Sequence, residues 1–151
     1  MTSLRRSVGI LAVLLGAATP ALAQQNDAAG RIKVVSGSAF IVRGSETIPA
    51  RAGELVFAAD GLRTGDAGTV GVTLKDDTRL SLGPNSEVRL ERYVYAPGNG
   101  GLGMVLRFVR GMAAYVSGRL ARLAPESIRL ETPAAIVGVR GTTLAIRVEE
   151  Q

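Results

Sequence analysis

The sequence contains no cysteine, no histidine and no tryptophan among its 151 residues. Without histidine, the chain lacks the serine–histidine and cysteine–histidine pairs that activate most nucleophiles, and it lacks the usual proton shuttle near neutral pH. Without cysteine it forms no disulfide, and the ordinary ligands of zinc, haem and iron–sulfur sites are missing. Carboxylates and hydroxyls are the groups left for catalysis. The composition therefore favours a protein that is not an enzyme and that binds no cofactor or metal.

Lysine is scarce as well. The 18 basic residues are 16 arginines and 2 lysines, and with 13 acidic residues the formal net charge is +5. Proteins that bind nucleic acid contact its phosphates with lysine as well as arginine, and they gather these residues into a stripe or patch. The arginines of this sequence are scattered along the chain. We therefore expect no nucleic-acid partner.

The first 23 residues have the composition of a secretory signal peptide. Two arginines form a positive start, an apolar run follows over residues 8–18, and Ala21 and Ala23 precede a cleavage site before Gln24. The alternative, an N-terminal membrane anchor, fits less well because the run is too short to span a bilayer. The sequence predicts a cleavable signal peptide (1–23), a short linker (24–30) and one β domain (31–149). The exported domain would be periplasmic or secreted, with no stable membrane insertion.

Beyond residue 30, apolar and polar residues alternate with the period of a half-buried strand. Val70, Val72 and Leu74 share one face, and two leucines resume that face after a turn at residues 75–77, which predicts a β-hairpin. A second turn is expected at residues 83–86. Further strands are expected over residues 87–95, 104–110, 112–116, 128–130 and 144–148, with Met112, Ala114 and Val116 on the buried face.

Helical periodicity is weak beyond residue 30. The best candidate covers residues 117–127 and is long enough for one or two turns. Short strands at close spacing and 19 glycines indicate an all-β fold. We expect a single compact sandwich or roll of short, mainly antiparallel strands with tight glycine-rich turns.

Four short motifs follow one another along the chain: Thr64-Gly65, Gly-Pro-Asn-Ser at 83–86, Thr132-Pro133-Ala134 and Arg140-Gly141-Thr142. In this order and spacing they resemble the FecR-type periplasmic domain, and the resemblance covers residues 31–148. Asp77 stands where the family prefers a hairpin glycine, and Leu144 stands in place of phenylalanine. Because aspartate tolerates a left-handed turn position, these departures leave the expected fold unchanged.

The resemblance implies a periplasmic binding or scaffold module, and it leaves a role in signalling or sensing open. Sensors of this family add a cytoplasmic anti-sigma segment, a membrane helix and a further periplasmic segment that meets an outer-membrane transporter. These segments have no counterpart in this sequence. We therefore expect a free-standing exported module and do not carry transcriptional control over to it.

Tyr93 and Tyr95 share a strand face with Arg89 and Glu91 if the alternation continues unbroken. Aromatic rings on the polar face of a strand can stack on a sugar or contact a protein, and the alternative is cross-strand packing. We take Tyr93, Tyr95 and Arg89 as candidate partner-binding residues for an unidentified envelope protein or glycan. Loss of both rings is then expected to weaken partner binding more than folding.

Arg140, Gly141 and Thr142 interrupt an apolar segment near the end of the sequence. Apolar residues alternate after Gly141 but not before it, around Gly138, so one straight half-buried strand is excluded. The favoured interpretation is a sharp bend of the backbone with a positive φ at Gly141, where the Cβ of any other residue would clash. Thr142 would then form a hydrogen bond with a backbone group that the bend leaves without a ladder partner. Arg140 would hold this corner by bonding loop carbonyls. In the alternative interpretation, the guanidinium of Arg140 binds an anionic ligand through two hydrogen bonds.

Five acidic residues stand in or beside predicted turns: Asp60, Asp66, Asp76, Asp77 and Glu87. Side chains of this kind in turns commonly accept hydrogen bonds from nearby backbone, and this accounts for their positions. Two of them could instead act as the acid and base of a hydrolase. Their spacing does not match a calcium-binding loop.

These features together favour an exported, non-catalytic binding or scaffold module of the cell envelope. A glycan- or peptidoglycan-binding module and a carboxylate-dependent hydrolase stay open as alternatives. A hydrolase would need two acidic residues that converge in one cleft. A peptidoglycan-binding module would be retained on purified cell wall.

The signal-peptide interpretation predicts that the exported protein begins at Gln24. N-terminal sequencing of the protein recovered from an envelope fraction checks this expectation. An intact Met1 in that fraction would contradict it.

Overall fold

The computed structural model of the chain describes residues 27–149. The predicted signal peptide (1–23) and the first part of the predicted linker lie outside the described residues. The first strand begins at Gly30, next to the predicted start of the domain at residue 31.

The expected all-β fold is confirmed, because strands make up most of the described chain. The strands are β1 (Gly30–Ser36), β2 (Ala39–Arg43), β3 (Glu46–Pro49), β4 (Leu55–Val56), β5 (Gly61–Thr64), β6 (Thr69–Leu74), β7 (Arg79–Leu82), β8 (Glu87–Ala96), β9 (Gly101–Val116), β10 (Ile128–Glu131), β11 (Ile136–Gly138) and β12 (Thr143–Val148). The helical segments of residues 27–149 are the single turn α1 (Leu120–Leu123) and the 3-10 turns η1 (Pro97–Asn99) and η2 (Pro125–Ser127). The short helical segment expected within residues 117–127 is therefore present.

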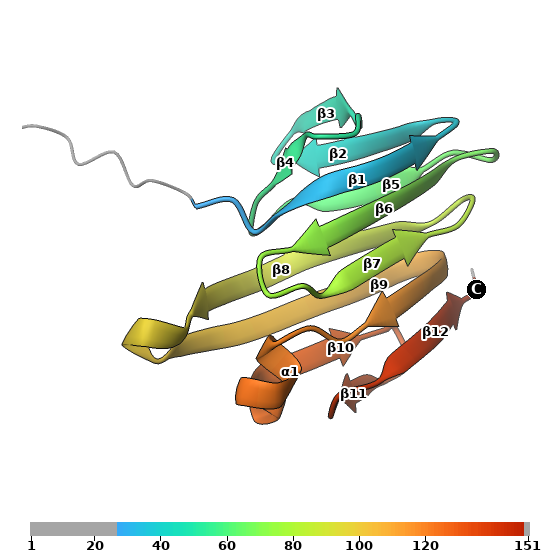
Figure 1. Cartoon of the computed structure of the whole chain (residues 1–151). Coiled ribbons are helices and arrows are strands. Elements are labelled where there is room, and N and C mark those ends of the chain that lie inside the picture. Colours follow the sequence, from blue (N-terminus) through green and yellow to red (C-terminus); the bar gives the residue numbers. More distant parts are fainter. Residues whose placement is uncertain (1–26, 150–151) are drawn as a thin grey trace, which may run out of the picture.

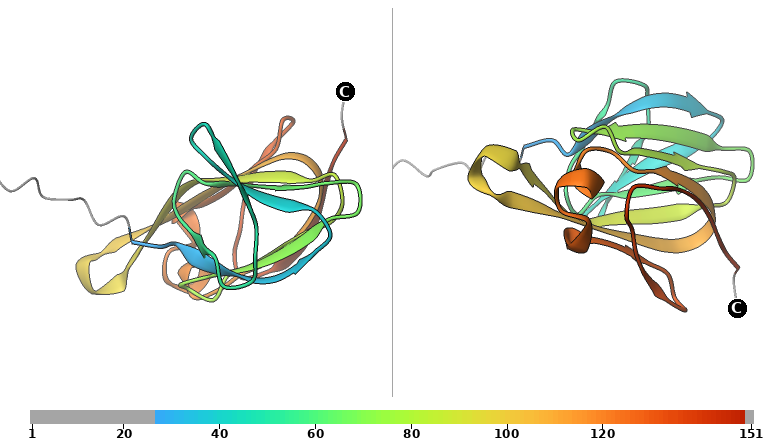
Figure 2. Two further views of the ribbon diagram at one scale, coloured as in Figure 1. Left: turned by 90° about the horizontal axis from the view of Figure 1, so that it is seen from above. Right: turned by 60° about the horizontal axis from the view of Figure 1, so that its bottom comes forward.

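The strands form one curled sheet whose two halves face each other (Figure 1, Figure 2). We call the half with strand order β4-β1-β6-β7-β9-β12 the first sheet. The half with strand order β3-β2-β5-β8-β9-β10-β11 is the second sheet. Neighbouring strands are antiparallel, except that β9 and β10 run parallel. Apolar side chains from both inner faces form a continuous core, which includes Ile32, Ile41, Leu106, Phe108 and Leu130.

The predicted hairpin of residues 70–82 is confirmed as β6 and β7, with Val70 opposite Leu82 and Val72 opposite Leu80. Its apolar residues face the core, as the alternation predicts. Asp77 has a φ of 68° in the connecting turn, so it occupies the left-handed position for which the FecR-type pattern uses glycine.

Strand β9 belongs to both sheets, and this is the feature that the sequence pattern did not reveal. Its first half pairs with β8 and β10, and its second half pairs with β7 and β12. Val109 has no partner in the ladder because Glu87 pairs with Arg110 and Val88 pairs with Phe108. Such an extra residue is a β-bulge, which bends the strand and moves it from one sheet into the other.

The bulge also reverses the face of the following residues, so the predicted burial of Met112, Ala114 and Val116 is wrong. Ala113 and Tyr115 point into the core, whereas the side chain of Met112 lies 46 % exposed on the outer face of the first sheet. A shift of one residue exchanges the two faces of a strand. The expected pair of strands at 104–110 and 112–116 is one bent strand.

Gly111 completes the bend with a φ of 81°. A Cβ at this position would lie 2.6 Å from the carbonyl oxygen of Asn85 and would also overlap the hydroxyl of Ser86. That hydroxyl accepts a hydrogen bond from the N–H of Met112 (2.8 Å) and donates to the carbonyl of Met112 (3.0 Å). The predicted turn at 83–86 therefore packs against the bend of β9 and is hydrogen-bonded to it.

Candidate functional site

The two candidate tyrosines lie on the inner side of β8 and not with Arg89, so the predicted shared face is wrong. Glu91 has no ladder partner, because Leu90 pairs with Leu106 and Arg92 pairs with Val105. This second bulge reverses the alternation, and Tyr93 and Tyr95 become half-buried against the core. Arg89 stays on the outer face, where it lies 3.5 Å from a carboxylate oxygen of Glu87.

The hydroxyl of Tyr93 is bonded to the buried residue Asp76. It donates to Oδ1 of Asp76 (2.9 Å) and accepts a hydrogen bond from the N–H of Asp76 (3.0 Å). Burial, followed by the negative charge of Asp76, raises the pKa of Tyr93, so the phenol keeps its proton and donates across the neutral range. The ring of Tyr95 packs beneath the guanidinium of Arg119, whose carbon lies 5.6 Å from the ring centre.

Asp76 is fully buried and connects three parts of the chain. Its carboxylate also accepts hydrogen bonds from the hydroxyl of Thr78 (2.7 Å) and the N–H of Leu120 (3.1 Å). Its backbone carbonyl accepts from the N–H of Arg119. The residue thereby ties the β6–β7 turn to β8 and to the start of α1. A carboxylate with this many internal donors is a structural group.

Asp60 and Glu87 are also held by internal contacts. Asp60 is buried and accepts two hydrogen bonds from the guanidinium of Arg43 (2.9 and 2.8 Å), which raise the pKa of Arg43, and a third from the N–H of Phe57 (2.8 Å). Glu87 is nearly buried and pairs with Arg63 at 3.3 Å. Asp66 and Asp77 are exposed.

These carboxylates do not converge as the hydrolase alternative requires. Residues 27–149 contain no group of three or more aspartate, glutamate, histidine or cysteine residues that could hold a metal ion. Each of the pockets described on this part of the chain is lined by at most one carboxylate.

The Thr-Pro motif forms the turn of a hairpin between β10 and β11. The hydroxyl oxygen of Thr132 accepts hydrogen bonds from the N–H groups of Ala134 and Ala135 (3.3 and 3.1 Å), and the N–H of Thr132 donates to the carbonyl of Ala135 (2.8 Å). Pro133 takes the next turn position, where its fixed φ fits. The hairpin projects from the body of the domain (Figure 2, right).

Strand β11 is exposed on both of its faces. The side chains of Ile136 and Val137 are 68 % and 41 % exposed, and β11 pairs with β10 alone. Hydrogen-bonded and non-hydrogen-bonded pairs alternate along an antiparallel ladder. Thr132 and Ala135 form a hydrogen-bonded pair, so the next such pair is Leu130 and Val137. The backbone N–H and carbonyl groups of Ile136 and Gly138 therefore point away from β10, to the free edge. Beside the strand is a pocket of about 410 Å³ lined by Arg107, Phe108, Glu131, Pro133 and Ile136, among others.

The segment after β11 turns at Gly141, which has the predicted positive φ (49°). The predicted steric reason is wrong, because a Cβ at Gly141 would meet no atom within 4 Å. The backbone of Thr142 exchanges hydrogen bonds with Ser117 (both 3.0 Å), whereas its hydroxyl reaches only its neighbour's carbonyl at 3.4 Å. Arg140 is exposed and has no hydrogen bond to a described residue, so it does not hold the corner.

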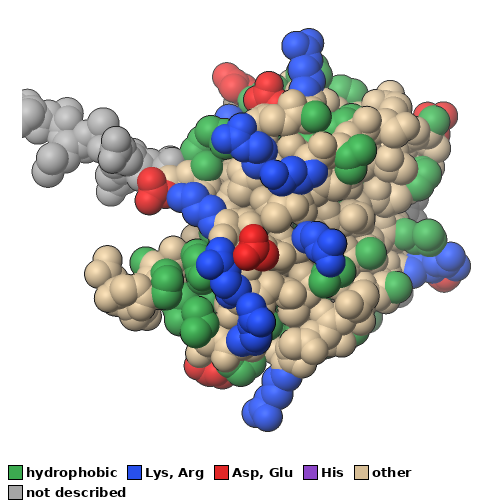
Figure 3. All heavy atoms as spheres, in the orientation of Figure 1, with side chains coloured by type: hydrophobic (Ala, Val, Ile, Leu, Met, Phe, Trp, Pro, Cys, Tyr) green, Lys and Arg blue, Asp and Glu red, His purple; other side chains and the backbone are tan. Residues whose placement is uncertain are grey.

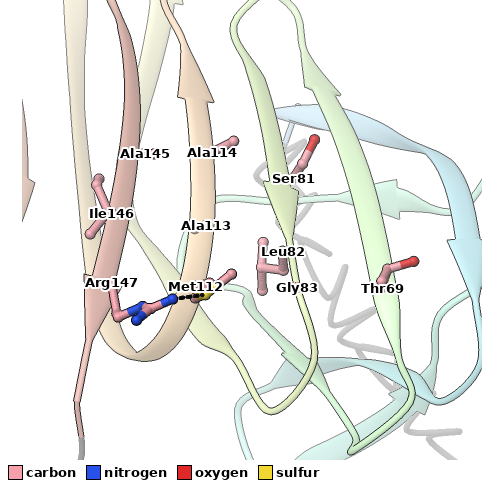
Figure 4. Close-up of a pocket in the computed structure, with 10 residues that line it drawn as sticks. All are labelled: Thr69, Ser81, Leu82, Gly83, Met112, Ala113, Ala114, Ala145, Ile146 and Arg147. Atoms are coloured by element: carbon pink, nitrogen blue, oxygen red, sulfur yellow. Dashed lines mark hydrogen bonds between the residues drawn. The ribbon is translucent and has the colours of Figure 1, made fainter.

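A second concave surface lies on the outer face of the first sheet, across β7, β9 and β12 (Figure 4). Small side chains, among them Ser81, Ala114 and Ala145, form a shallow groove of about 520 Å³. At one end Arg147 donates a hydrogen bond to the sulfur of Met112 (3.2 Å).

A family model described as FecR protein matches residues 60–151, which is more than half of the chain. The chain belongs to the FecR protein family. The match begins later than the resemblance described above, which starts at residue 31. No curated protein and no solved structure matches the chain. Residues 27–149 of this FecR protein contain no helix that is long and apolar enough to cross a membrane.

Sequence reasoning missed the exposed edge of β11 in this FecR domain. In the sequence, Ile136 and Val137 belong to an apolar segment that resembles buried core, and only the lack of alternation before Gly141 indicated otherwise. The candidate functional site is therefore the β10–β11 hairpin, with its free edge, two exposed apolar side chains and adjoining pocket.

Replacing Tyr93 with phenylalanine is expected to destabilise the protein by about 1–3 kcal/mol, because the buried N–H and carboxylate of Asp76 each lose a partner. Tyr95→Phe is the matched control, since the hydroxyl of Tyr95 has no hydrogen bond to a described residue. Denaturant unfolding of both variants measures the difference. Equal stability of the two variants would show that the Tyr93–Asp76 contact contributes nothing.

Proposed function

We propose that this FecR domain is a non-catalytic binding module of the cell envelope, periplasmic or secreted, which serves sensing or signalling by binding a partner protein at the β10–β11 hairpin. The observation that carries the proposal is the free edge of β11. Its outward backbone groups can pair with an extended segment of the partner, while Ile136 and Val137 contact the partner's side chains on either face.

The exposure of β11 supports a binding role because free strand edges are usually protected. Proteins cover such edges, or place charges or proline on them, to prevent unwanted pairing. Ile136, Val137 and Gly138 carry neither charge nor proline, and two large apolar side chains stand in solvent. An exposed apolar edge of this kind promotes aggregation unless a binding partner covers it.

A protein partner is favoured over the glycan alternative. The rings that suggested sugar stacking, Tyr93 and Tyr95, pack inward against the core. The non-catalytic assignment rests on the buried and bonded state of Asp60, Asp76 and Glu87, which leaves these carboxylates in structural roles.

A photo-reactive amino acid placed at Ile136 is expected to form a cross-link to an envelope protein in intact cells. The same substitution at Leu123 is the matched control, because Leu123 is similarly exposed (54 %) but lies on α1 and not on the β10–β11 hairpin. Gel analysis after irradiation is expected to show a heavier band for the Ile136 variant only. The absence of that band, or an equal band from Leu123, would refute the hairpin as the binding site.

A further inference from the structure

The strands of the first sheet carry basic side chains and no acidic ones. Arg31 and Lys33 lie on β1, Arg79 on β7 and Arg147 on β12, and Lys75 follows β6 in the turn. All five are exposed, and none forms a salt bridge with a described residue. Figure 3 shows this face, with lysine and arginine side chains spread over it and few carboxylates between them.

The second sheet is more evenly charged, since several of its arginines are paired with glutamates. Arg107 lies 3.1 Å from Glu131 and 3.5 Å from Glu91, and Glu87 pairs with Arg63 at 3.3 Å. The positive net charge of the chain is therefore not evenly distributed. The outer face of the first sheet carries five exposed cations that no salt bridge to a described residue neutralises.

Carboxylates in the neighbouring segments form no salt bridge with these cations: Asp27 lines a pocket together with Lys75, and Glu54 precedes β4. Asp77 lies in the β6–β7 turn and is paired with Arg119 at 3.1 Å. Glu149 follows β12 and is a single charge at one end of the face.

The same face exposes large apolar side chains. Val34, Leu55 and Met112 are 59 %, 38 % and 46 % exposed. Val34 faces outward because Lys33 forms a bulge, as Ile32 pairs with Val72 and Val34 with Gly71. Met112 stands at the end of the shallow groove in Figure 4. The outer face of the first sheet thus exposes both cations and large apolar side chains.

We propose that the outer face of the first sheet is a docking surface for a lipid bilayer with anionic headgroups. Lysine and arginine near such a surface gain energy from its negative potential, and their apolar stems and the neighbouring Val34, Leu55 and Met112 can enter the headgroup region. A soluble polyanion would satisfy the cations but would leave these apolar side chains in water. The proposal is independent of the β10–β11 hairpin, whose strands belong to the second sheet.

Co-sedimentation of the exported protein with vesicles tests this surface. Vesicles containing phosphatidylglycerol are expected to bind the protein, and vesicles of phosphatidylcholine alone are not. The double variant Lys33→Gln/Arg79→Gln should bind about 25-fold more weakly, at about fivefold for each cation removed. The matched control is Arg92→Gln/Arg129→Gln, which removes the same charge from exposed arginines of the second sheet and should bind like the wild type.

Two further measurements separate a bilayer from other anions. Val34→Thr keeps the side-chain shape and should weaken vesicle binding while leaving any binding to polyglutamate unchanged. Equal binding of both vesicle types, an equal loss in the control double variant, or polyglutamate binding as tight as vesicle binding would overturn the proposal.

Discussion

The bend of β9 at Gly111, held by the hydroxyl of Ser86, is the constraint on which the rest of the structure depends. The strand can serve both sheets only because Val109 leaves the ladder and Gly111 adopts a positive φ immediately after it. The Ser86 hydroxyl then forms hydrogen bonds with the N–H and the carbonyl of Met112, and these fix the direction of the second half of β9. A single strand thereby connects two facing sheets around one core.

Both proposed binding surfaces follow from this bend. The first half of β9 pairs with β10 and so supports the hairpin whose outer strand is the free edge of β11. The second half pairs with β7 and β12 and completes the basic face of the first sheet. Because the two halves of β9 belong to different layers, the two proposed surfaces lie on different sheets.

The sequence predicted those features that depend on a few neighbouring residues. The alternation of Val70, Val72 and Leu74 located a hairpin, and turn residues located the ends of β6, β7 and β8. The positive φ of Gly141 also followed from the change of pattern around it.

Features that depend on bulges could not be predicted, because one extra residue exchanges the two faces of a strand. Glu91, Val109 and Lys33 look like ordinary strand residues in the sequence, and only the pairing with a distant strand shows that each lies outside the ladder. For this reason the inward position of Tyr93, the exposure of Met112 and the exposure of Val34 all had to come from the structure. The central role of Asp76 was hidden in the same way, since its partners Tyr93 and Leu120 lie 17 and 44 residues away.

The stability of Gly111→Ala relative to Gly141→Ala tests the central role of the β9 bend most directly. Both glycines have a positive φ, so alanine at either position carries the left-handed penalty of about 1–2 kcal/mol. Only Gly111 is closed in by Asn85 and Ser86, whereas Gly141 has open space. Denaturant unfolding should therefore show a loss of about 4 kcal/mol or more for Gly111→Ala and no more than about 2 kcal/mol for Gly141→Ala. Equal losses in the two variants would contradict a bend that is locked against the Ser86 turn.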